Sequence, residues 1–320
     1  MPEGDAIRRL ASTMNELFTG GSVLASSPQG RFAASAEKIN GRVLERIRVH
    51  GKHMFIGFVP PEAVGSEPQE WMHIHLGLYG WWRFNGDESV VDEGHGVAHR
   101  IAPVAKGEWD GHSETRWGEG YGQAAKGEWE PPEPVGQVRF RMYNEHAVAD
   151  LIGPNRCELI SNEERITAQA KLGPDPLDEG AREDQEAAKR FAEVAHAKKR
   201  AIGEIVMDQA IIAGVGNIYR ADALFLAGIS PYRKGSNISA KRLTDLWVLI
   251  CDLMNRGLAA GRLETMDPLE APNPPLEGDE EASRWYVYHR TGRPCLRCGT
   301  PVREALMQNR RLFWCPSCQR

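Results

Sequence analysis

The stretch that decides the fold reads AGVGNIYRADALFLAGISP and covers residues 213–231. Its first five residues form a glycine-containing turn, and the apolar residues that follow have helical spacing. This run ends at Gly228, and Pro231 lies just beyond it. Glycine directly after a helix and proline shortly beyond it are typical stop signals. Because residues 198–212 also carry a helical pattern, we predict two helices joined by the turn.

Two interpretations fit the turn at residues 213–217. A turn that opens a helix points N–H groups outward, where they can bind an anion, and Asn217 would add a side-chain donor. A Gly-x-Gly-Asn sequence between helices is equally typical of a tight packing turn. The stretch by itself leaves both interpretations open.

The C-terminal tail carries four cysteines with the spacing of a metal site. Two Cys-x2-Cys pairs, separated by sixteen residues, comprise Cys295, Cys298, Cys315 and Cys318. Four thiolates complete a tetrahedral Zn²⁺ site and leave no open position for a catalytic water. We therefore predict one structural zinc ion that holds a β-hairpin. The remaining cysteines, Cys157 and Cys251, are expected to be small buried apolar residues.

Charge is distributed unevenly along the chain. The net charge of −5 by itself argues against a nucleic-acid partner. However, residues 284–320 contain eight arginines and one acid, whereas residues 87–133 contain eleven acids and four basic residues. Arg310 and Arg311 lie near the turn of the expected zinc hairpin, where an arginine suits a phosphate or a groove. A basic tail that is merely solvated is the alternative.

Length and composition bound the class of protein. With 320 residues, 41% of them hydrophobic, the chain is long enough for two or three domains with cores of their own. No apolar run approaches the roughly 18 residues of a membrane span. The acidic residues at the N-terminus also differ from the basic start of a signal peptide. We expect a soluble globular protein in the cytoplasm.

The first part of the chain shows a helix followed by alternating strands. An amphipathic helix is expected at residues 6–18. Residues 41–58 alternate on both sides of a His-Gly-Lys turn, which predicts a β-hairpin with Lys52 at its tip or shoulder.

Further strands are expected at residues 71–84 and 137–153. Between about residues 85 and 137 the alternation dissolves, and the pentapeptide AKGEW occurs twice, at 105–109 and 125–129. A short duplication of this kind predicts an inserted mobile loop, because a true solenoid needs at least three copies.

The chain begins MPEGD. Proline in the first turn of a helix needs no backbone N–H, so the plain interpretation is a helix start at Pro2. Once Met1 is removed, however, Pro2 presents an α-amino group, which titrates near pH ~8 against ~10.4 for lysine. An appreciable fraction of such an amine is an unprotonated nucleophile at neutral pH.

Together these motifs resemble the formamidopyrimidine-DNA glycosylase and endonuclease VIII family of base-excision repair enzymes, and within it the actinobacterial endonuclease VIII-like group. The matching stretches, in chain order, are Pro2-Glu3-Gly4, Gly51-Lys52, residues 213–231 and C-x2-CG…RRLFWCPSCQ. The resemblance implies an α+β fold with an N-terminal β-sandwich domain and flanking helices, a helix–two-turns–helix domain, and a C-terminal zinc β-hairpin with four cysteine ligands. The expected boundaries are 1–170 for the β-sandwich domain with its insert, 171–183 for a linker, 184–265 for the helical DNA-binding domain, 266–284 for a loop and 285–320 for the zinc finger.

The resemblance also assigns chemistry to residues. Pro2 would attack the anomeric C1′ of a damaged nucleotide, expel the base and form an iminium that leads to β- and δ-elimination. Glu3 would handle protons at the sugar oxygen, and Lys52 would protonate the base or ring oxygen while contacting phosphate. Arg310 is counted with these catalytic residues. The ordinary alternatives are a first-turn acid for Glu3 and a plain hairpin lysine for Lys52.

Further residues would bind DNA by the same resemblance. Asn217 and Arg310 would grip phosphates on either side of the lesion, and Asp222, where the family has a glutamate, would orient the turn. Leu78 and Tyr79 would fill the hole left by the flipped nucleotide. The alternative for Leu78 and Tyr79 is a place in the core of a strand.

Three departures from the family bear on the substrate. Gly77 stands where the endonuclease VIII branch has the glutamine of a Gln-Leu-Tyr triplet, NEHAVADLIGP stands where the 8-oxoguanine branch has DPRRFG, and Ala6 replaces a second glutamate. We expect a bifunctional glycosylase and AP lyase that excises mainly oxidised pyrimidines. A formamidopyrimidine/8-oxoguanine glycosylase and, in another class, a non-catalytic zinc-ribbon DNA-binding protein are the alternatives. The expected partner is damaged DNA, bound by a nucleoid-associated monomer without membrane contact.

Overall fold

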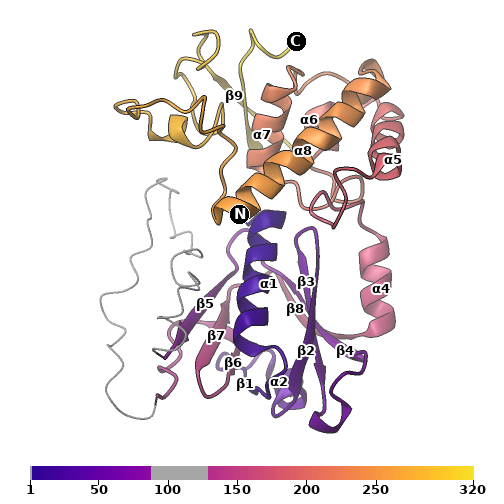
Figure 1. Cartoon of the computed structure of the whole chain (residues 1–320), viewed down its shortest axis with the longest axis vertical. Helices are drawn as coiled ribbons and strands as arrows, with labels where there is room; N and C mark the ends of the chain where they lie inside the picture. Colours follow the sequence, from indigo (N-terminus) through magenta and orange to yellow (C-terminus); the bar gives the residue numbers. More distant parts are fainter. Residues whose placement is uncertain (1, 88–128) are drawn as a thin grey trace. The chain divides into compact units, whose positions relative to one another are not determined.

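The computed structural model describes residues 2–87 and 129–320, and the chain divides into two compact units, whose elements are labelled in Figure 1. The first unit comprises the residues up to Pro2 together with Ile7–Gln169. The second comprises Glu3–Ala6 together with Ala170–Arg320. The N-terminal segment therefore contributes to both units. Most of the predicted acidic insert, including the first AKGEW copy, lies outside the described residues.

The first unit is a β-sandwich of two four-stranded antiparallel sheets. One sheet has the strand order β1-β6-β7-β5 and the other has the order β2-β3-β4-β8. The strands are β1 (Leu24–Ser26), β2 (Val43–His50), β3 (His53–Val59), β4 (Glu70–His75), β5 (Trp81–Gly86), β6 (Val138–Tyr143), β7 (Ala147–Ile152) and β8 (Arg156–Ser161). The helices of this part of the chain are α1 (Gly4–Phe18), α2 (Ala33–Ile39), the short η1 (Pro61–Ala63) and α4 (Asn162–Ala170).

Both sheets and α1 share one hydrophobic core. On α1, Ile7, Leu10 and Met14 recur at helical spacing and are buried. Ile56 of β3 and Phe140 of β6 belong to the same cluster, so the core lies between the two sheets. The predicted N-terminal sandwich and its amphipathic helix are confirmed.

Two stretches predicted as single strands are each divided by a turn. Residues 71–84 form β4 and β5, which belong to different sheets, and Gly77 between them has φ +69°. Residues 137–153 form the hairpin β6–β7, where the Asn144 side chain accepts hydrogen bonds from the backbone N–H groups of His146 and Ala147. The single-strand predictions are wrong because turn chemistry at one residue outweighs alternation on either side.

The second unit is mainly helical and ends in a β-hairpin. Its helices are α5 (Gln185–His196), α6 (Ile202–Ile205), α7 (Asn217–Leu226), η2 (Gly235–Asn237), α8 (Ala240–Ala260) and η3 (Glu280–Ser283), and its strands are β9 (Arg303–Met307) and β10 (Arg310–Trp314). The helix predicted after the glycine turn is confirmed as α7. The helix predicted before it is reduced to the single turn of α6. The Gln209 side chain bonds the Gly214 N–H and the Val215 carbonyl, which closes a loop in place of further helix.

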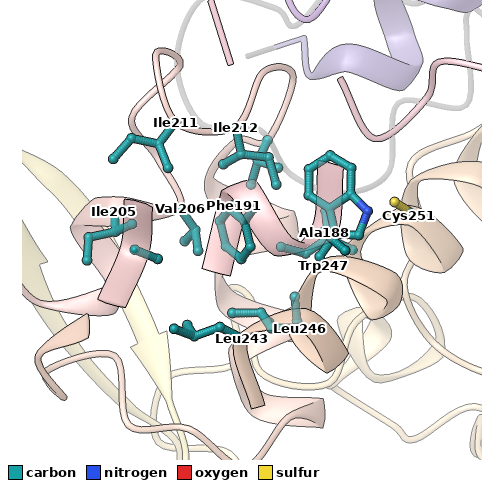
Figure 2. Packing of buried hydrophobic residues seen from close by; sticks show 14 of the residues in the cluster. Ala188, Phe191, Ile205, Val206, Ile211, Ile212, Leu243, Leu246, Trp247 and Cys251 are labelled. Carbon is teal, nitrogen blue, oxygen red and sulfur yellow. The ribbon is translucent and has the colours of Figure 1, made fainter. Parts of the chain in front are cut away.

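Helices α5 and α8 build the core of the second unit, which Figure 2 shows from close by. Phe191 of α5 and Trp247 of α8 have ring centroids 5.8 Å apart. Cys251 is buried in the same cluster, as predicted. Leu177 and Ala181, which fall in the predicted linker, also belong to it. Residues 171–183 thus pack as part of this unit.

Helix α8 owes its length to defined ends. The Ser239 side chain accepts a hydrogen bond from the Arg242 N–H at its start, and Gly261, at φ +69°, ends it. Within the described ranges, no helix is long and apolar enough to cross a membrane.

Candidate active site

The N-terminal segment is fixed at the glycine turn. Helix α1 begins at Gly4, so Pro2 precedes the helix, and the prediction that it occupies the first helical turn is wrong. The Gly4 N–H donates to the Gly214 carbonyl at 2.9 Å, and Glu3 is only 1% exposed. Because this backbone pairs with the turn, α1 starts two residues after Pro2.

The Glu3 carboxylate caps α7. Its Oε2 accepts a hydrogen bond from the Gly216 N–H at 2.8 Å, and its Oε1 accepts one from the Ile218 N–H at 2.9 Å. Gly216, the residue before α7, offers no side chain for this purpose. The helix therefore takes its capping anion from the other end of the sequence. The interpretation of these two amides as an open site for an external anion is wrong, because the chain's own carboxylate already binds them.

Glycine at position 216 makes this contact possible. A Cβ atom there would lie 2.3 Å from Glu3 Cδ and 2.5 Å from Glu3 Oε1, closer than real Cβ contacts. Gly257 of α8 is constrained in a similar way, since its Cβ would lie 2.4 Å from the Tyr219 hydroxyl oxygen and 3.3 Å from Asp5 Oδ2. Gly216 thus accommodates Glu3, which is the packing interpretation of the motif, and Gly257 accommodates Tyr219 and Asp5.

Asn217, the first residue of α7, hydrogen-bonds to the β9–β10 hairpin. Its Nδ2 donates to the Arg311 carbonyl at 2.9 Å. Arg220 donates through Nη2 to the same carbonyl at 2.9 Å and also to Asn217 Oδ1. Burial and the charge of Arg310 lower the pKa of Arg220 to about 10, so the guanidinium stays charged at neutral pH.

The two arginines after the hairpin turn have different surroundings. Gln308 and Asn309 form the turn at positive φ, which places Arg310 at the start of β10. Arg311 makes two hydrogen bonds to Glu304 on β9, at 2.6 and 2.9 Å. Hydrogen bonding from Arg311 lowers the pKa of Glu304 to about 2. Arg311 thus forms an ion pair with Glu304 within the hairpin. The positive charge of Arg310 contributes to the lowered pKa of Arg220.

Asp222 anchors a segment other than the predicted one. Its buried carboxylate accepts hydrogen bonds from the Thr265 hydroxyl and from the backbone N–H groups of Tyr286, Val287 and Tyr288. The expectation that Asp222 orients the turn at 213–217 is therefore wrong. Five helical residues rotate a side chain by about 140°, so Asp222 leaves α7 on a different side from Asn217. Burial raises the pKa of Asp222, and these hydrogen bonds oppose the rise.

Tyr288 lies close to the side chains of Glu3 and Asn217. Burial and the Glu3 carboxylate raise the pKa of Tyr288 to about 12, so the phenol is protonated at neutral pH. Its ring stacks on His289 with centroids 4.3 Å apart. No motif or spacing in the sequence indicated Tyr288. Arg220 could have been found, because it is a charged residue three positions after Asn217 in an apolar helical run.

In the first unit, Lys52 lies in the two-residue turn between β2 and β3, as predicted. His50 and His53 face each other across this turn, and Gly51 has φ +56°. Lys52 is 6% exposed. Together with burial, its charge lowers the pKa of His75 on β4. The hairpin thus holds the ammonium group at a defined place.

Sequence reasoning missed a histidine cluster on the same sheet. His53 Nδ1 and His73 Nε2 lie 2.8 Å apart, and His73 Nδ1 lies 3.5 Å from Glu158 Oε1. Burial lowers the pKa of His53 to about 3 and that of His73 to about 4. Both rings are therefore neutral at physiological pH and supply hydrogen bonds without charge.

Leu78 and Tyr79 lie in the turn between β4 and β5. They are 55% and 81% exposed, so neither is a core residue of a strand. The Gly80 N–H closes the turn by donating to the Leu76 carbonyl at 3.0 Å. A Cβ at Gly77 would lie 2.7 Å from the Asn155 Cβ, on a backbone at φ +69°. The turn thus requires glycine where the endonuclease VIII branch carries glutamine.

The four tail cysteines meet around one point. Cys295 and Cys298 precede β9, Cys315 and Cys318 follow β10, and their Sγ atoms all lie within 4.8 Å of one another. The Sγ atoms of Cys295 and Cys318 are 3.9 Å apart, and those of Cys298 and Cys315 are 3.4 Å apart. Zn–S bonds of about 2.3 Å put tetrahedral sulfur atoms about 3.8 Å apart. The predicted cysteine cluster is confirmed, and its dimensions fit zinc.

Comparisons with known proteins agree with this arrangement. The formamidopyrimidine-DNA glycosylase N-terminal domain matches residues 1–149, and the formamidopyrimidine-DNA glycosylase H2TH domain matches residues 172–267. Endonuclease 8 1 of Mycobacterium tuberculosis (strain H37Rv) is 37% identical over 319 residues, which covers 100% of both chains. Formamidopyrimidine-DNA glycosylase of Desulfitobacterium hafniense (strain DCB-2) is 34% identical over 166 residues, 51% of this chain and 58% of its own.

Solved structures share the fold. MutM (Fpg) of Thermus thermophilus gives a TM-score of 0.66 at 20% identity and covers 99% of this chain and 98% of its own. Lactococcus lactis Fpg, non-covalently bound to DNA containing an AP site, gives 0.68 at 17% identity and covers 99% of each chain. The predicted α+β architecture is thereby confirmed. The 37% identity to Endonuclease 8 1 extends over the full length of both chains. The chain therefore belongs to the formamidopyrimidine-DNA glycosylase and endonuclease VIII family of DNA glycosylases with AP lyase activity.

Proposed function

We propose that this chain uses Pro2 as its nucleophile and excises oxidised pyrimidines from DNA. The observation that carries the proposal is the position of Glu3, whose buried carboxylate binds two amides at the start of α7. One peptide bond joins Glu3 to Pro2. Once Met1 is removed, a secondary amine therefore stands beside a carboxylate whose own position is fixed.

The chemistry follows from the properties of a secondary amine. The unprotonated Pro2 nitrogen attacks C1′, the bond from C1′ to the base breaks, and the base leaves with a proton supplied by an acid. The sugar ring opens as O4′ takes up a proton, and Pro2 remains bound to C1′ as a charged iminium. An iminium formed from a secondary amine has no proton on nitrogen to lose, so it stays positively charged and remains an electron sink.

Strand cleavage follows from the same intermediate. The iminium acidifies the C2′ proton, and loss of that proton expels the 3′ phosphate by β-elimination. A second elimination expels the 5′ phosphate, and water then hydrolyses the iminium and releases Pro2. We assign the proton transfer at O4′ to Glu3 and protonation of the base or ring oxygen to Lys52.

Phosphate binding falls to Asn217 and Arg310 in this proposal. Asn217 begins α7 and is partly exposed, and Arg310 begins β10 directly after the hairpin turn. Arg311 makes two hydrogen bonds to Glu304, and we assign the phosphate at this turn to Arg310 on the family resemblance. One zinc ion bound by the four cysteines would hold the two ends of this hairpin together and would take no part in the reaction.

The proposed lesion class rests on the exposed side chains of Leu78 and Tyr79 and on the relatives of the chain. Leu78 and Tyr79 are exposed on one turn, as side chains that replace a flipped nucleotide must be. The relative that matches over its full length is named Endonuclease 8 1, whereas the formamidopyrimidine-DNA glycosylase of Desulfitobacterium hafniense matches over about half. A formamidopyrimidine-type substrate is therefore the second candidate.

Borohydride trapping and a lesion panel test both parts. The native enzyme should form a covalent adduct with an abasic-site oligonucleotide, and Pro2→Gly and Glu3→Gln should reduce it strongly. Glu163→Gln, an exposed acid in the first turn of α4, is the matched control. Excision should be faster on thymine glycol and dihydrouracil than on 8-oxoguanine. An undiminished adduct from Pro2→Gly would exclude the mechanism, and the reverse lesion order would favour the second candidate.

A further inference from the structure

We infer that Arg220 is a positioning residue, which fixes the Asn217 side-chain amide with its NH2 group available to a DNA phosphate. The inference rests on the proposed function, because it concerns how Asn217 would bind that phosphate. Arg220 lies one helical turn after Asn217 on α7. It is 1% exposed, so it acts through other protein groups and not by contact with DNA.

A carboxamide can be turned around with little change in shape, but its two ends have opposite polarity. Asn217 Oδ1 accepts a hydrogen bond from Arg220 Nη2, and Asn217 Nδ2 donates one to the Arg311 carbonyl at 2.9 Å. A guanidinium has only donors and a carbonyl has only acceptors. Rotation of the amide by 180° would therefore set donor against donor and acceptor against acceptor. The two partners permit one orientation.

This orientation suits an anion. The Nδ2 group has two hydrogens, and the Arg311 carbonyl takes one of them. The Asn217 side chain also hydrogen-bonds the Tyr288 hydroxyl, and a phosphate oxygen would compete with that hydroxyl for the second hydrogen. In the opposite orientation Oδ1 would face the phosphate and repel it. Arg220 and the Arg311 carbonyl together thus decide whether Asn217 presents a donor or an acceptor.

The surroundings of Arg220 argue against a role in packing alone. Its neighbours Ala221, Leu224 and Phe225 are buried and apolar. Within residues 2–87 and 129–320, Arg220 Nε and Nη1 are buried without a hydrogen-bond partner. Burial and Arg310 lower its pKa by more than Glu3 raises it, which means that the charged form is kept at a net cost. An apolar residue would fill this place without that cost, so we assign the guanidinium the role of a hydrogen-bond donor.

Three substitutions separate a donor from a space-filling group. Arg220→Lys keeps a residue with donors only, Arg220→Gln can both donate and accept, and Arg220→Met fills the space without hydrogen bonds. We expect the Kd for abasic-site duplex to rise about 10- to 100-fold for Gln and Met, the usual effect of one hydrogen bond to a charged group. Lys should recover most of that loss. Equal losses for Lys and Met would overturn the inference.

Arg242→Met is the matched control. Arg242 also donates through Nη2 to two carbonyl oxygens, those of Ala227 and Gly228, and among the described residues no hydrogen bond joins it to Asn217 or to the β9–β10 hairpin. It should lose thermal stability to a similar degree and retain its DNA affinity. A comparable loss of affinity in Arg242→Met would show that the Arg220 effect is merely one of stability.

A double-mutant cycle tests whether Arg220 acts through Asn217. In an Asn217→Ala background, Arg220→Met should add less than a twofold further loss, because the amide it positions is gone. Additive losses would overturn the inference.

If the Arg220 variants fail to fold, substitutions of Asn217 still test the inference. Asn217→Asp can still accept from Arg220 but presents only oxygens, so it should bind DNA less tightly than Asn217→Ala. Tighter binding by Asn217→Asp than by Asn217→Ala would contradict the inference. DNA affinity is measured for all these variants, and borohydride trapping is measured for the native enzyme. Absence of a covalent adduct from the native enzyme would refute the proposed function. A native adduct together with additive losses of DNA affinity would refute only the role of Arg220.

Discussion

Replacing Gly216 by alanine should uncouple Glu3 from α7 with no change in charge. The added Cβ would lie 2.3 Å from Glu3 Cδ, whereas ordinary contacts begin at 3.4 Å, so Glu3 must retreat by about 1 Å. Gly216 has φ −124°, which alanine adopts without strain. The effect of the substitution therefore arises from Glu3 and not from the backbone.

The expected size follows from the two hydrogen bonds that Glu3 would no longer accept. Hydrogen bonds to a charged group contribute about 1.5–3 kcal/mol each, so removal of both amide bonds would lower the free energy of unfolding by about 3–6 kcal/mol. Pro2 is joined to Glu3 and would move with it. A displacement of about 1 Å at a reacting group can slow a reaction about 100-fold. We expect Gly216→Ala to fold less stably and to trap abasic-site DNA about 100-fold more slowly.

Single-turnover borohydride trapping and chemical denaturation measure the two effects. Gly21→Ala is the control, because a Cβ there meets only the Phe18 carbonyl oxygen at 3.5 Å. In the double variant Glu3→Ala/Gly216→Ala the clash disappears, so stability should recover in part while the trapping rate stays low. A Gly216→Ala enzyme that traps at the native rate would refute the claim that Glu3 and its amides fix the nucleophile.

Three further predictions concern the hairpin and its metal. Arg310→Ala should reduce the salt dependence of DNA affinity by about one phosphate contact, whereas the charge-neutral pair Glu304→Gln/Arg311→Gln should leave the slope unchanged; equal slopes for both variants would contradict the assignment. Because the pKa of Glu304 is lowered to about 2, the Glu304–Arg311 pair stabilises the fold above the ordinary glutamate pKa of ~4.3, and this stabilisation is lost as the pH falls toward 2. Acid unfolding of Glu304→Gln should lack this loss of stability. An unchanged acid-unfolding profile would count against a stabilising role of the pair. Removal of zinc by a chelator should unfold the β9–β10 hairpin and abolish DNA binding until zinc is restored, so full affinity in protein shown to be zinc-free by elemental analysis would exclude a structural role.

Much of the fold could be predicted from local chemistry. Cysteine spacing located the cluster of four cysteines, and the stop signals at Gly228 and Pro231 located the end of α7. Alternation found the β2–β3 hairpin with Lys52 in its turn. These features depend on residues that are close in sequence, so a single sequence reveals them.

Two errors in the candidate site share a cause in long-range contacts, whereas the errors in strands and helix length arise from local turns. The amides of Gly216 and Ile218 looked available, because residues 213–217 contain no acid, but Glu3 binds them from the other end of the chain. Asp222 was assigned to the nearby turn, whereas its partners are Thr265 and residues 286–288. A pattern shows which side chains can hydrogen-bond, but only the packed chain decides with which partner.

The central claim is that the nucleophile is the amine of Pro2, and mapping the trapped adduct tests it most directly. Native enzyme would be reduced with borohydride on an abasic-site oligonucleotide, digested with nuclease and protease, and analysed by mass spectrometry. We predict that the sugar remnant is found on a peptide that begins at Pro2 and lacks Met1. A remnant on Lys52 or another lysine, or an active enzyme that retains Met1, would contradict the account.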